Sequence, residues 1–162
     1  MSRIDFVTGA PVRYAEQVSE LAKLANDTKR YIPIQKKQSA ADIHHDEAKW
    51  ENHRIVCHMR NYAANINTLM KRMLIDTDPS QLIWNEQETY VNLNQSEKET
   101  LYIFNQFKSL VEEMVFMLSK TPDAAWGRAG KHVYLGRVSV KQLVKWHTNH
   151  IKQHIQQLKE TE

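Results

Sequence analysis

The stretch SVKQLVKWHTNHIKQHIQQLK (residues 139–159) decides the fold expected for this chain. Its apolar residues recur at intervals of three and four, which is the period of a helix that buries one face. That face consists of Val140, Leu143, Val144, Ile151, Ile155 and Leu158. Ser139 and Gln142 have the spacing of a capping box, which predicts that the helix begins there, and we expect it to end near Lys159. Such a helix needs other helices to cover its apolar face.

Three other segments predict long helices, over residues 11–30, 48–74 and 96–120. The last of these opens with a second capping-box pattern, from Ser96 to Glu99. We expect a short helical turn at TPDAAW (121–126) and a loop or an extended arm at KHVYLGRVSV (131–140). Only 4 glycines and 4 prolines interrupt the 162 residues, which favours long helices over a β fold with many turns. We therefore predict an all-α protein, an antiparallel four-helix bundle that forms one domain over residues 1–162.

The composition narrows the range of functions. The formal net charge is +3, and acidic and basic residues are interspersed, which argues against a nucleic-acid-binding surface. The single cysteine, Cys57, fits a reducing compartment. The N-terminal residues show no apolar leader, and no stretch approaches the 18 apolar residues of a membrane helix. The sequence thus predicts a cytoplasmic protein without a membrane segment.

Four histidines lie on the apolar sides of two predicted helices. At about 100° per residue, His147 and His154 fall within the apolar arc of the last helix, and His150 lies at its edge. His58 lies on the apolar stripe of segment 48–74. Burying several imidazoles together is costly unless each finds a partner, and one divalent metal ion can satisfy several of them.

The spacing of these histidines is compatible with a metal site. His150 and His154 lie one helical turn apart on the same side, so both can bind a single ion. His58 is the best placed third ligand. Three protein ligands leave coordination positions open to water or substrate, which is typical of catalytic sites. From the residues alone, ordinary buried histidines remain an equally good interpretation.

Two segments carry matching motifs, WENHRIVCHMRNYAANI (50–66) and GRVSVKQLVKWHTNHIKQHI (136–155). In the first, Trp50 precedes His58 by eight residues, and in the second an aromatic residue and a histidine precede HxxxH and Ile. This pattern resembles the DinB/YfiT-like superfamily of metal-dependent four-helix bundles, and its YfiT branch in particular.

The resemblance implies that His58, His150 and His154 bind one divalent ion, usually nickel or zinc. It also implies a homodimer and one of two activities, metal-dependent hydrolysis or the transfer of a low-molecular-weight thiol. The sequence departs from the family pattern at Asn61, where an Asp is common, and at Ile151, where a second His is frequent. Unlike Asp, Asn61 cannot act as a carboxylate base.

Two further residues are candidates for a catalytic role. His147 would line the site, orient a ligand or carry a proton, or else it fills a gap in the core. Glu51 lies seven residues before His58 and therefore on the same side of its helix, where it would hold a ligand or carry a proton. The alternative for Glu51 is a simple charge at the start of the helix.

Other residues are assigned plainer roles. Cys57 points about 100° away from its neighbour in the predicted triad, so we expect a small buried hydrophobe. His44 and His45 lie in a polar connection and are expected at the solvated surface. Trp84 and Tyr90 either wall a pocket or pack in the core.

Two functions remain in competition. One is a metal-dependent enzyme, a hydrolase or a thiol transferase, that acts on a small molecule. The other is a non-catalytic bundle in which the metal joins two helices and serves stability, sensing or partner binding. Because the three imidazoles bind metal only when neutral, and their ordinary pKa is about 6.5, the sequence predicts that metal affinity falls steeply below about pH 6.

Overall fold

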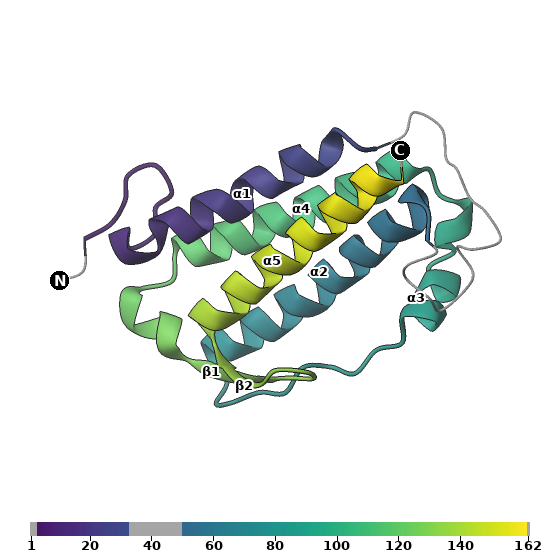
Figure 1. The fold of residues 1–162 in the computed structure, drawn as a ribbon. Coiled ribbons are helices and arrows are strands. Elements are labelled where there is room, and N and C mark those ends of the chain that lie inside the picture. The colour runs from purple at the N-terminus through teal and green to yellow at the C-terminus, as the bar shows by residue number, and fades with distance from the viewer. Residues whose placement is uncertain (1–2, 33–49, 162) are drawn as a thin grey trace.

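The computed structural model describes residues 3–32 and 50–161 (Figure 1). The long helices in this part of the chain are α1 (Ala15–Lys29), α2 (Asn52–Ile75), α4 (Thr100–Ser119) and α5 (Val140–Glu160). The shorter elements are η1 (Val12–Tyr14), α3 (Glu86–Asn92), η4 (Gln95–Glu97), η5 (Asp123–Gly127), β1 (Ala129–His132) and β2 (Gly136–Ser139). The all-α four-helix bundle predicted from the sequence is confirmed, and the two-stranded sheet is a minor addition to it.

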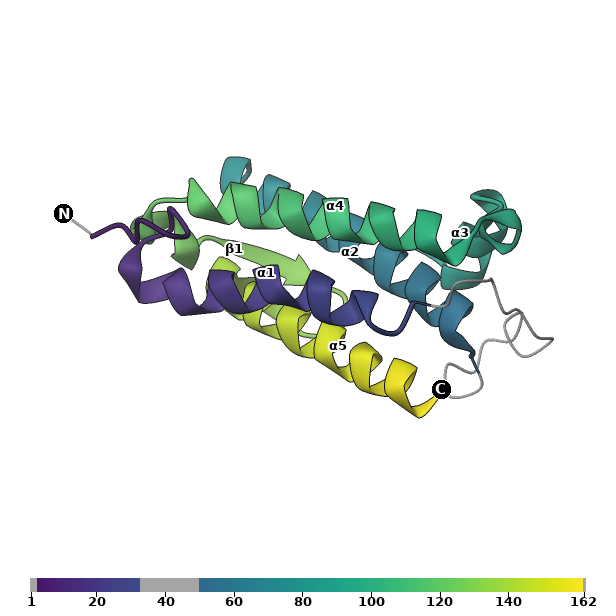
Figure 2. The ribbon, with the colours of Figure 1, turned by 90° about the horizontal axis from the view of Figure 1, so that it is seen from above.

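The long helices pack in the cyclic order α1, α4, α2, α5. Figure 2 shows α2 beside α4 and α1 beside α5. Helices α2 and α4 run in the same direction, because His53 near the start of α2 bonds Thr100 at the start of α4. Further along the same two helices, Asn67 donates to the carbonyl of Leu110. The antiparallel contact that matters for the site is the one between α2 and α5.

The parallel pair results from a long connection. After Ile75 the chain runs back along the bundle to α3, which lies near the start of α2, and α4 begins there (Figure 1). Helix α4 ends at the other end of the bundle, where η5 and the hairpin lead into α5. This arrangement is not the simple up-down-up-down order in which every neighbouring pair is antiparallel.

One hydrophobic core runs through the bundle. The apolar stripes expected from the sequence are buried, except that Ile155 is only partly buried. Each large side chain taken from water contributes about 1.5–3 kcal/mol to stability. The largest fully buried apolar side chains are Trp126, Phe104, Phe107, Leu21, Ile55, Ile66, Leu69, Met70, Met73, Ile103 and Met114. Trp126 of η5 stacks on Tyr14 of η1 with ring centroids 4.2 Å apart, at one end of the core.

The two predicted capping boxes have different outcomes. In α5 the box is complete, since the Ser139 hydroxyl accepts from the Gln142 N–H and the Gln142 side chain accepts from the Ser139 N–H. The box predicted at Ser96 is wrong. Residues 95–97 form the separate turn η4, and α4 begins only after Glu99, whose side chain makes no capping bond.

Helix α3 and the hairpin were not predicted as regular elements. Asn85 caps α3 by accepting from the Glu88 N–H, and this Asn-x-x-Glu spacing is a start signal that could have revealed the helix. The loop or extended arm expected over residues 131–140 is part of a hairpin that spans residues 129–139 and pairs Ala129 with Ser139. The turn expected at TPDAAW is confirmed as η5.

No helix among the described residues combines the length and the apolar character that a membrane span requires.

Candidate metal centre

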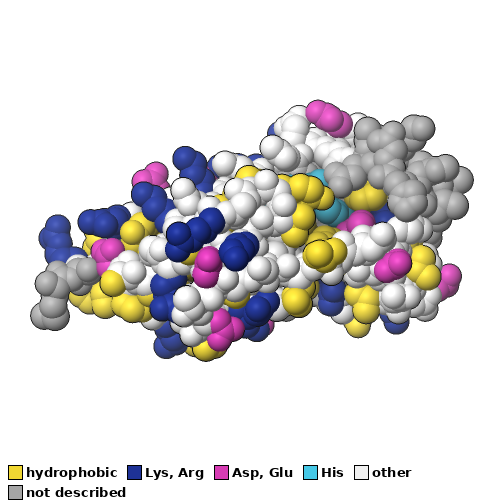
Figure 3. All heavy atoms as spheres, turned by 90° about the horizontal axis from the view of Figure 1, so that it is seen from below, with side chains coloured by type: hydrophobic (Ala, Val, Ile, Leu, Met, Phe, Trp, Pro, Cys, Tyr) yellow, Lys and Arg dark blue, Asp and Glu magenta, His cyan; other side chains and the backbone are white. Residues whose placement is uncertain are grey.

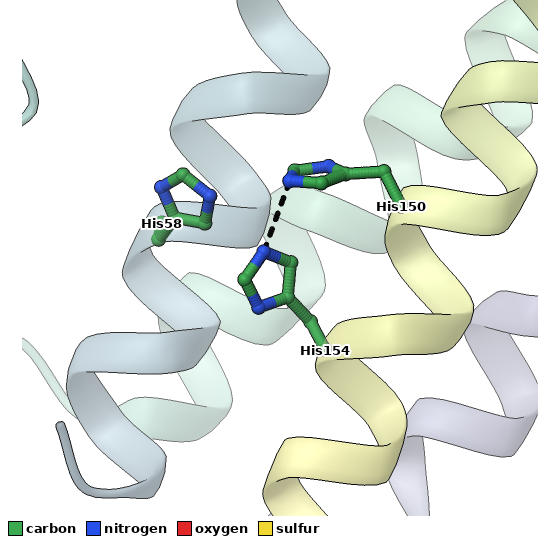
Figure 4. Close-up of side chains that lie close together, drawn as sticks. All are labelled: His58, His150 and His154. Atoms are coloured by element: carbon green, nitrogen blue, oxygen red, sulfur yellow. Dashed lines mark hydrogen bonds between the residues drawn. The ribbon is translucent and has the colours of Figure 1, made fainter. Parts of the chain in front are cut away.

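Two neighbouring helices bring three histidines together. His58 comes from α2, and His150 and His154 come from α5, one turn apart (Figure 4). One ring nitrogen from each histidine lies within 4.8 Å of the other two. The approach is possible because α2 and α5 are direct antiparallel neighbours. The three rings point toward one another across the contact between the helices.

Hydrogen bonds on the outer ring nitrogens orient two of these imidazoles. His58 Nδ1 lies 3.1 Å from Glu86 Oε2, and His154 Nδ1 lies 2.9 Å from Gln157 Oε1. Both oxygens are acceptors, so the imidazoles carry their protons on Nδ1 and leave a lone pair on Nε2. Metal-binding histidines are commonly held in this way.

The inner nitrogens fit a metal ion. His58 Nε2 is buried and finds no hydrogen-bond partner among the described residues. His154 Nε2 lies 3.0 Å from His150 Nε2, which must donate the proton of that bond because His154 carries its own on Nδ1. A buried acceptor without a donor, next to two more imidazole nitrogens, is the environment that a divalent ion satisfies.

Burial keeps two of these histidines in the neutral form that binds metal. Desolvation, reinforced by the nearby imidazole of His58, lowers the pKa of His154 to about 4. The pKa of His150 is also lowered, by burial first and then by its neighbours His154 and His58. Metal binding therefore faces little competition from protons at these two side chains near neutral pH.

Aromatic rings surround the cluster. Trp50 and Trp84 lie on the His58 side, with ring centroids 5.6 and 6.3 Å from the imidazole, and Trp146 stacks on His150 at 5.0 Å. The ring of Trp84 is half-buried. Figure 3 shows a histidine side chain in a hollow between hydrophobic side chains, with an acidic side chain beside it. The rings limit the access of water to the imidazoles.

Tyr62 links the cluster to the hairpin. Its ring centroid lies 4.4 Å from that of His150, and its hydroxyl lies 2.7 Å from His132 Nε2. The backbone N–H groups of Tyr134 and Leu135 both donate to His132 Nδ1, so His132 carries its proton on Nε2 and donates it to Tyr62. Burial raises the pKa of Tyr62, which keeps the phenol protonated.

A carboxylate from α3 reaches the same site. Glu86 Oε2 accepts from His58, while Glu86 Oε1 lies 3.3 Å from Arg54 Nη1 and 3.4 Å from Asn61 Nδ2. Asn61 is buried and exchanges two hydrogen bonds with the side-chain amide of Gln95, at 2.9 and 2.8 Å. Sequence reasoning missed Glu86 because α3 itself was not predicted.

The residues suggested for catalysis lie outside the three-histidine group. His147 is 1% exposed, and neither ring nitrogen has a hydrogen-bond partner within the described segments. Burial lowers its pKa to about 4. Glu51 is the half-buried N-cap residue of α2, and the carboxylate bonded to His58 is that of Glu86. The catalytic roles of His147 and Glu51 stay predictions.

The remaining assignments have mixed outcomes. Cys57 is fully buried, as expected, with its sulfur 3.6 Å from His53 Nε2. His44 and His45 lie outside the described residues. Trp84 lies against the histidine cluster, while Tyr90 is buried under the guanidinium of Arg54, 3.8 Å from its ring centroid. Of these two aromatic residues, one borders the site and the other packs behind it.

The fold of this chain is similar to that of a solved structure. No protein-family model matches the chain, and no curated protein matches it in sequence. Among solved structures, the chain is similar to YfiT from Bacillus subtilis, a probable metal-dependent hydrolase with an unusual four-helix bundle topology. The TM-score is 0.76 at 14% sequence identity, over 90% of this chain and 83% of YfiT. The chain thus has the DinB/YfiT-like fold, and its described residues include a histidine cluster that can hold a metal ion.

Proposed function

We propose that this protein is a divalent-metal-dependent enzyme that acts on a small molecule, either as a hydrolase or as a thiol transferase. His58, His150 and His154 hold the ion, for which nickel and zinc are the candidates. The observation that carries the proposal is the buried His58 Nε2, which has no hydrogen-bond partner among the described residues and lies beside two other imidazole nitrogens. The fold shared with YfiT, a probable metal-dependent hydrolase, supports the hydrolase reading.

When bound, the ion supplies Lewis-acid chemistry, which makes water or a thiol nucleophilic near neutral pH. The protein side chains prepare the site for this. Glu86 and Gln157 accept from Nδ1 of two ligands, and the tryptophan rings limit the access of water to the imidazoles. His150 carries its proton on Nε2 in the absence of an ion, so ion binding requires this proton to leave that nitrogen. His147 and Glu51 are the candidates to carry a proton to or from the substrate.

The competing function is a bundle in which the metal only joins α2 to α5. A closed structural site takes four protein ligands, whereas a catalytic site keeps a position open. Within the described residues, the cluster contains three potential ligands. This count favours the enzyme.

The proposal predicts one divalent ion per chain, measured by elemental analysis of the purified protein. The double variant His150→Ala/His154→Ala should lose the ion, because a single imidazole on α2 remains. His147→Leu is the matched control: it removes a buried histidine of the same helix from outside the cluster and should keep the full metal content. Full occupancy in the double variant would place the ligands elsewhere and refute the assignment.

Activity distinguishes the two functions once metal content is known. The loaded protein is assayed with a panel of esters, amides and phosphoesters, and with small thiols plus an electrophile. Turnover that disappears in the double variant supports the enzyme. A loaded protein inactive in both panels, with a fourth protein ligand visible by X-ray absorption, supports the structural role instead.

The same proposal includes a homodimer in the cytoplasm. Large apolar side chains exposed on the hairpin tip, among them Tyr134 at 84% exposure, support self-association. Sedimentation equilibrium of the full chain should give twice the monomer mass. A monomer at micromolar concentration would remove the dimer from the proposal without affecting the metal site.

A further inference from the structure

Helix α3 places the carboxylate of Glu86 beside Nδ1 of His58. Glu86 is the first residue of α3, and its two oxygens contact three side chains of α2. Oε2 accepts from His58, while Oε1 lies within reach of Arg54 and Asn61. The three partners occupy two successive turns of one helix, so they form a single surface against which Glu86 is held.

Arg54 is the strongest anchor for this carboxylate. It is fully buried, and its guanidinium lies between the rings of Trp50 and Tyr90, at 4.7 and 3.8 Å from their centroids. Its two terminal nitrogens bond the side chains of Glu86 and Gln87, both on α3. A buried cation needs a nearby anion. Arg54 therefore keeps Glu86 at the site.

Asn61 supplies the remaining restraint. Its side-chain oxygen accepts from Gln95 Nε2 and its nitrogen donates to Gln95 Oε1, so the orientation of the amide is fixed. In that orientation the nitrogen also faces Glu86 Oε1. An Asp at this position would replace a donor by a second negative charge next to Glu86 and opposite an amide oxygen. The neutral Asn61 fits a site whose carboxylate comes from α3.

We propose that Glu86 is the positioning residue of the metal ligand His58. By accepting the Nδ1 proton it fixes the tautomer and the ring orientation that present Nε2 to the ion. The inference rests on the metal site proposed above, to which it adds a third element, α3.

The test compares zinc affinities of the full-length protein by competition with a chromophoric chelator. Glu86→Ala should weaken zinc binding by about 10- to 100-fold, which is the usual effect of removing a partner of a ligating histidine. Glu86→Gln should lose less, since its amide oxygen can still accept from His58. Glu88→Gln is the matched control, because it removes the same charge from the same turn of α3 at an exposed position and should keep wild-type affinity.

A second measurement uses the metal-free protein. Nitrogen NMR of the imidazoles should show the His58 proton on Nδ1 in the wild type and a population with the proton on Nε2 in Glu86→Ala. A merely structural role for Glu86 would not move this signal. If Glu86→Ala does not fold, Glu86→Gln decides the question by its zinc affinity, which should be lower than that of Glu88→Gln, because a neutral amide oxygen is a weaker acceptor for His58 than a carboxylate.

The outcomes separate the two proposals. A wild type that binds neither zinc nor nickel overturns the metal site, while the tautomer of His58 still tests Glu86. Equal zinc affinity in folded Glu86→Ala and Glu88→Gln would overturn the positioning role and leave the metal site intact. A wild-type His58 protonated on Nε2 would overturn it as well.

Discussion

At the scale of single residues, the environment of each imidazole decides what it can do. His58 and His154 direct their protons outward to Glu86 and Gln157, so each inner nitrogen keeps a lone pair that can bind an ion. Asn61, where the family resemblance implies an Asp, donates to Glu86 and to Gln95. Its neutral amide is therefore part of the site's hydrogen-bond network.

The lowered pKa values change the expected pH dependence of metal binding. With ordinary histidines, three protons would compete with the ion, and log affinity would rise with pH with a slope approaching three between pH 5 and 6. Burial lowers the pKa of both His150 and His154, so neither contributes a proton in this range. We expect a slope of about one or less.

Zinc titrations at pH 5.0, 5.5 and 6.0 measure this slope, and circular dichroism of the same samples verifies that the protein stays folded. A slope near three would mean that the imidazoles titrate as they do in water. The cluster would then be open to water.

At the scale of elements, short pieces between the long helices shape the site. Helix α3 carries Glu86, and β1 ends at His132, which bonds Tyr62. The hairpin packs closely against Met73 of α2 at Gly130. Its residue Lys131 also forms an isolated parallel β-bridge with Ser80, in the connection after α2. These pieces are too short to form alone, so tertiary contacts must stabilise them.

Gly130→Ala tests how tightly the hairpin packs. A Cβ at Gly130 would lie 2.6 Å from Cγ and 2.8 Å from Sδ of Met73, which is fully buried. We expect a loss of about 1–3 kcal/mol in unfolding free energy, the usual cost of overpacking a core. Gly127→Ala is the control, since nothing lies within 4 Å of its added Cβ, and it should change stability by less than about 0.5 kcal/mol. Urea denaturation of both variants measures the difference, and similar losses would contradict the packing described.

At the scale of the whole molecule, two pairs of neighbouring helices determine the arrangement of the bundle and the place of the histidines. The parallel pair of α2 and α4 places His53 and Thr100 at one end of the bundle. The antiparallel contact of α2 with α5 places the histidine cluster within the bundle, between the two helices. Because the histidines lie at this contact, the stability of the molecule and the protonation of the site are coupled.

His147 should make the metal-free protein sensitive to acid. Its pKa is lowered from 6.5 to about 4 in the folded state, so the unfolded chain binds one more proton between these values. Stability is therefore complete above about pH 6.5 and decreases as the pH falls toward 4. For this residue alone, we expect a loss of about 2 kcal/mol between pH 7.5 and 5.

His147→Leu isolates this contribution. Leucine has a similar size and no nitrogen to protonate, so stability at pH 7.5 should stay the same or rise. The decrease on going to pH 5 should be smaller than in the wild type by the same amount. Denaturant unfolding in the presence of a chelator measures both quantities. An unchanged pH dependence would show that His147 is accessible to protons in the folded protein.

Helix periodicity and capping are local properties, and for this reason the sequence alone determined the four long helices, the start of α5 at Ser139 and the histidines on the inner faces. It failed at Ser96, because a turn stabilised by distant contacts of Gln95 delays the start of α4. Periodicity does not report which helices are neighbours or what lies behind an imidazole. Only the tertiary structure decided that α2 and α4 are parallel. It alone brought Glu86, 28 residues away in sequence, to His58. The physical reason is that these contacts depend on how the connecting segment crosses the bundle, which no local pattern encodes.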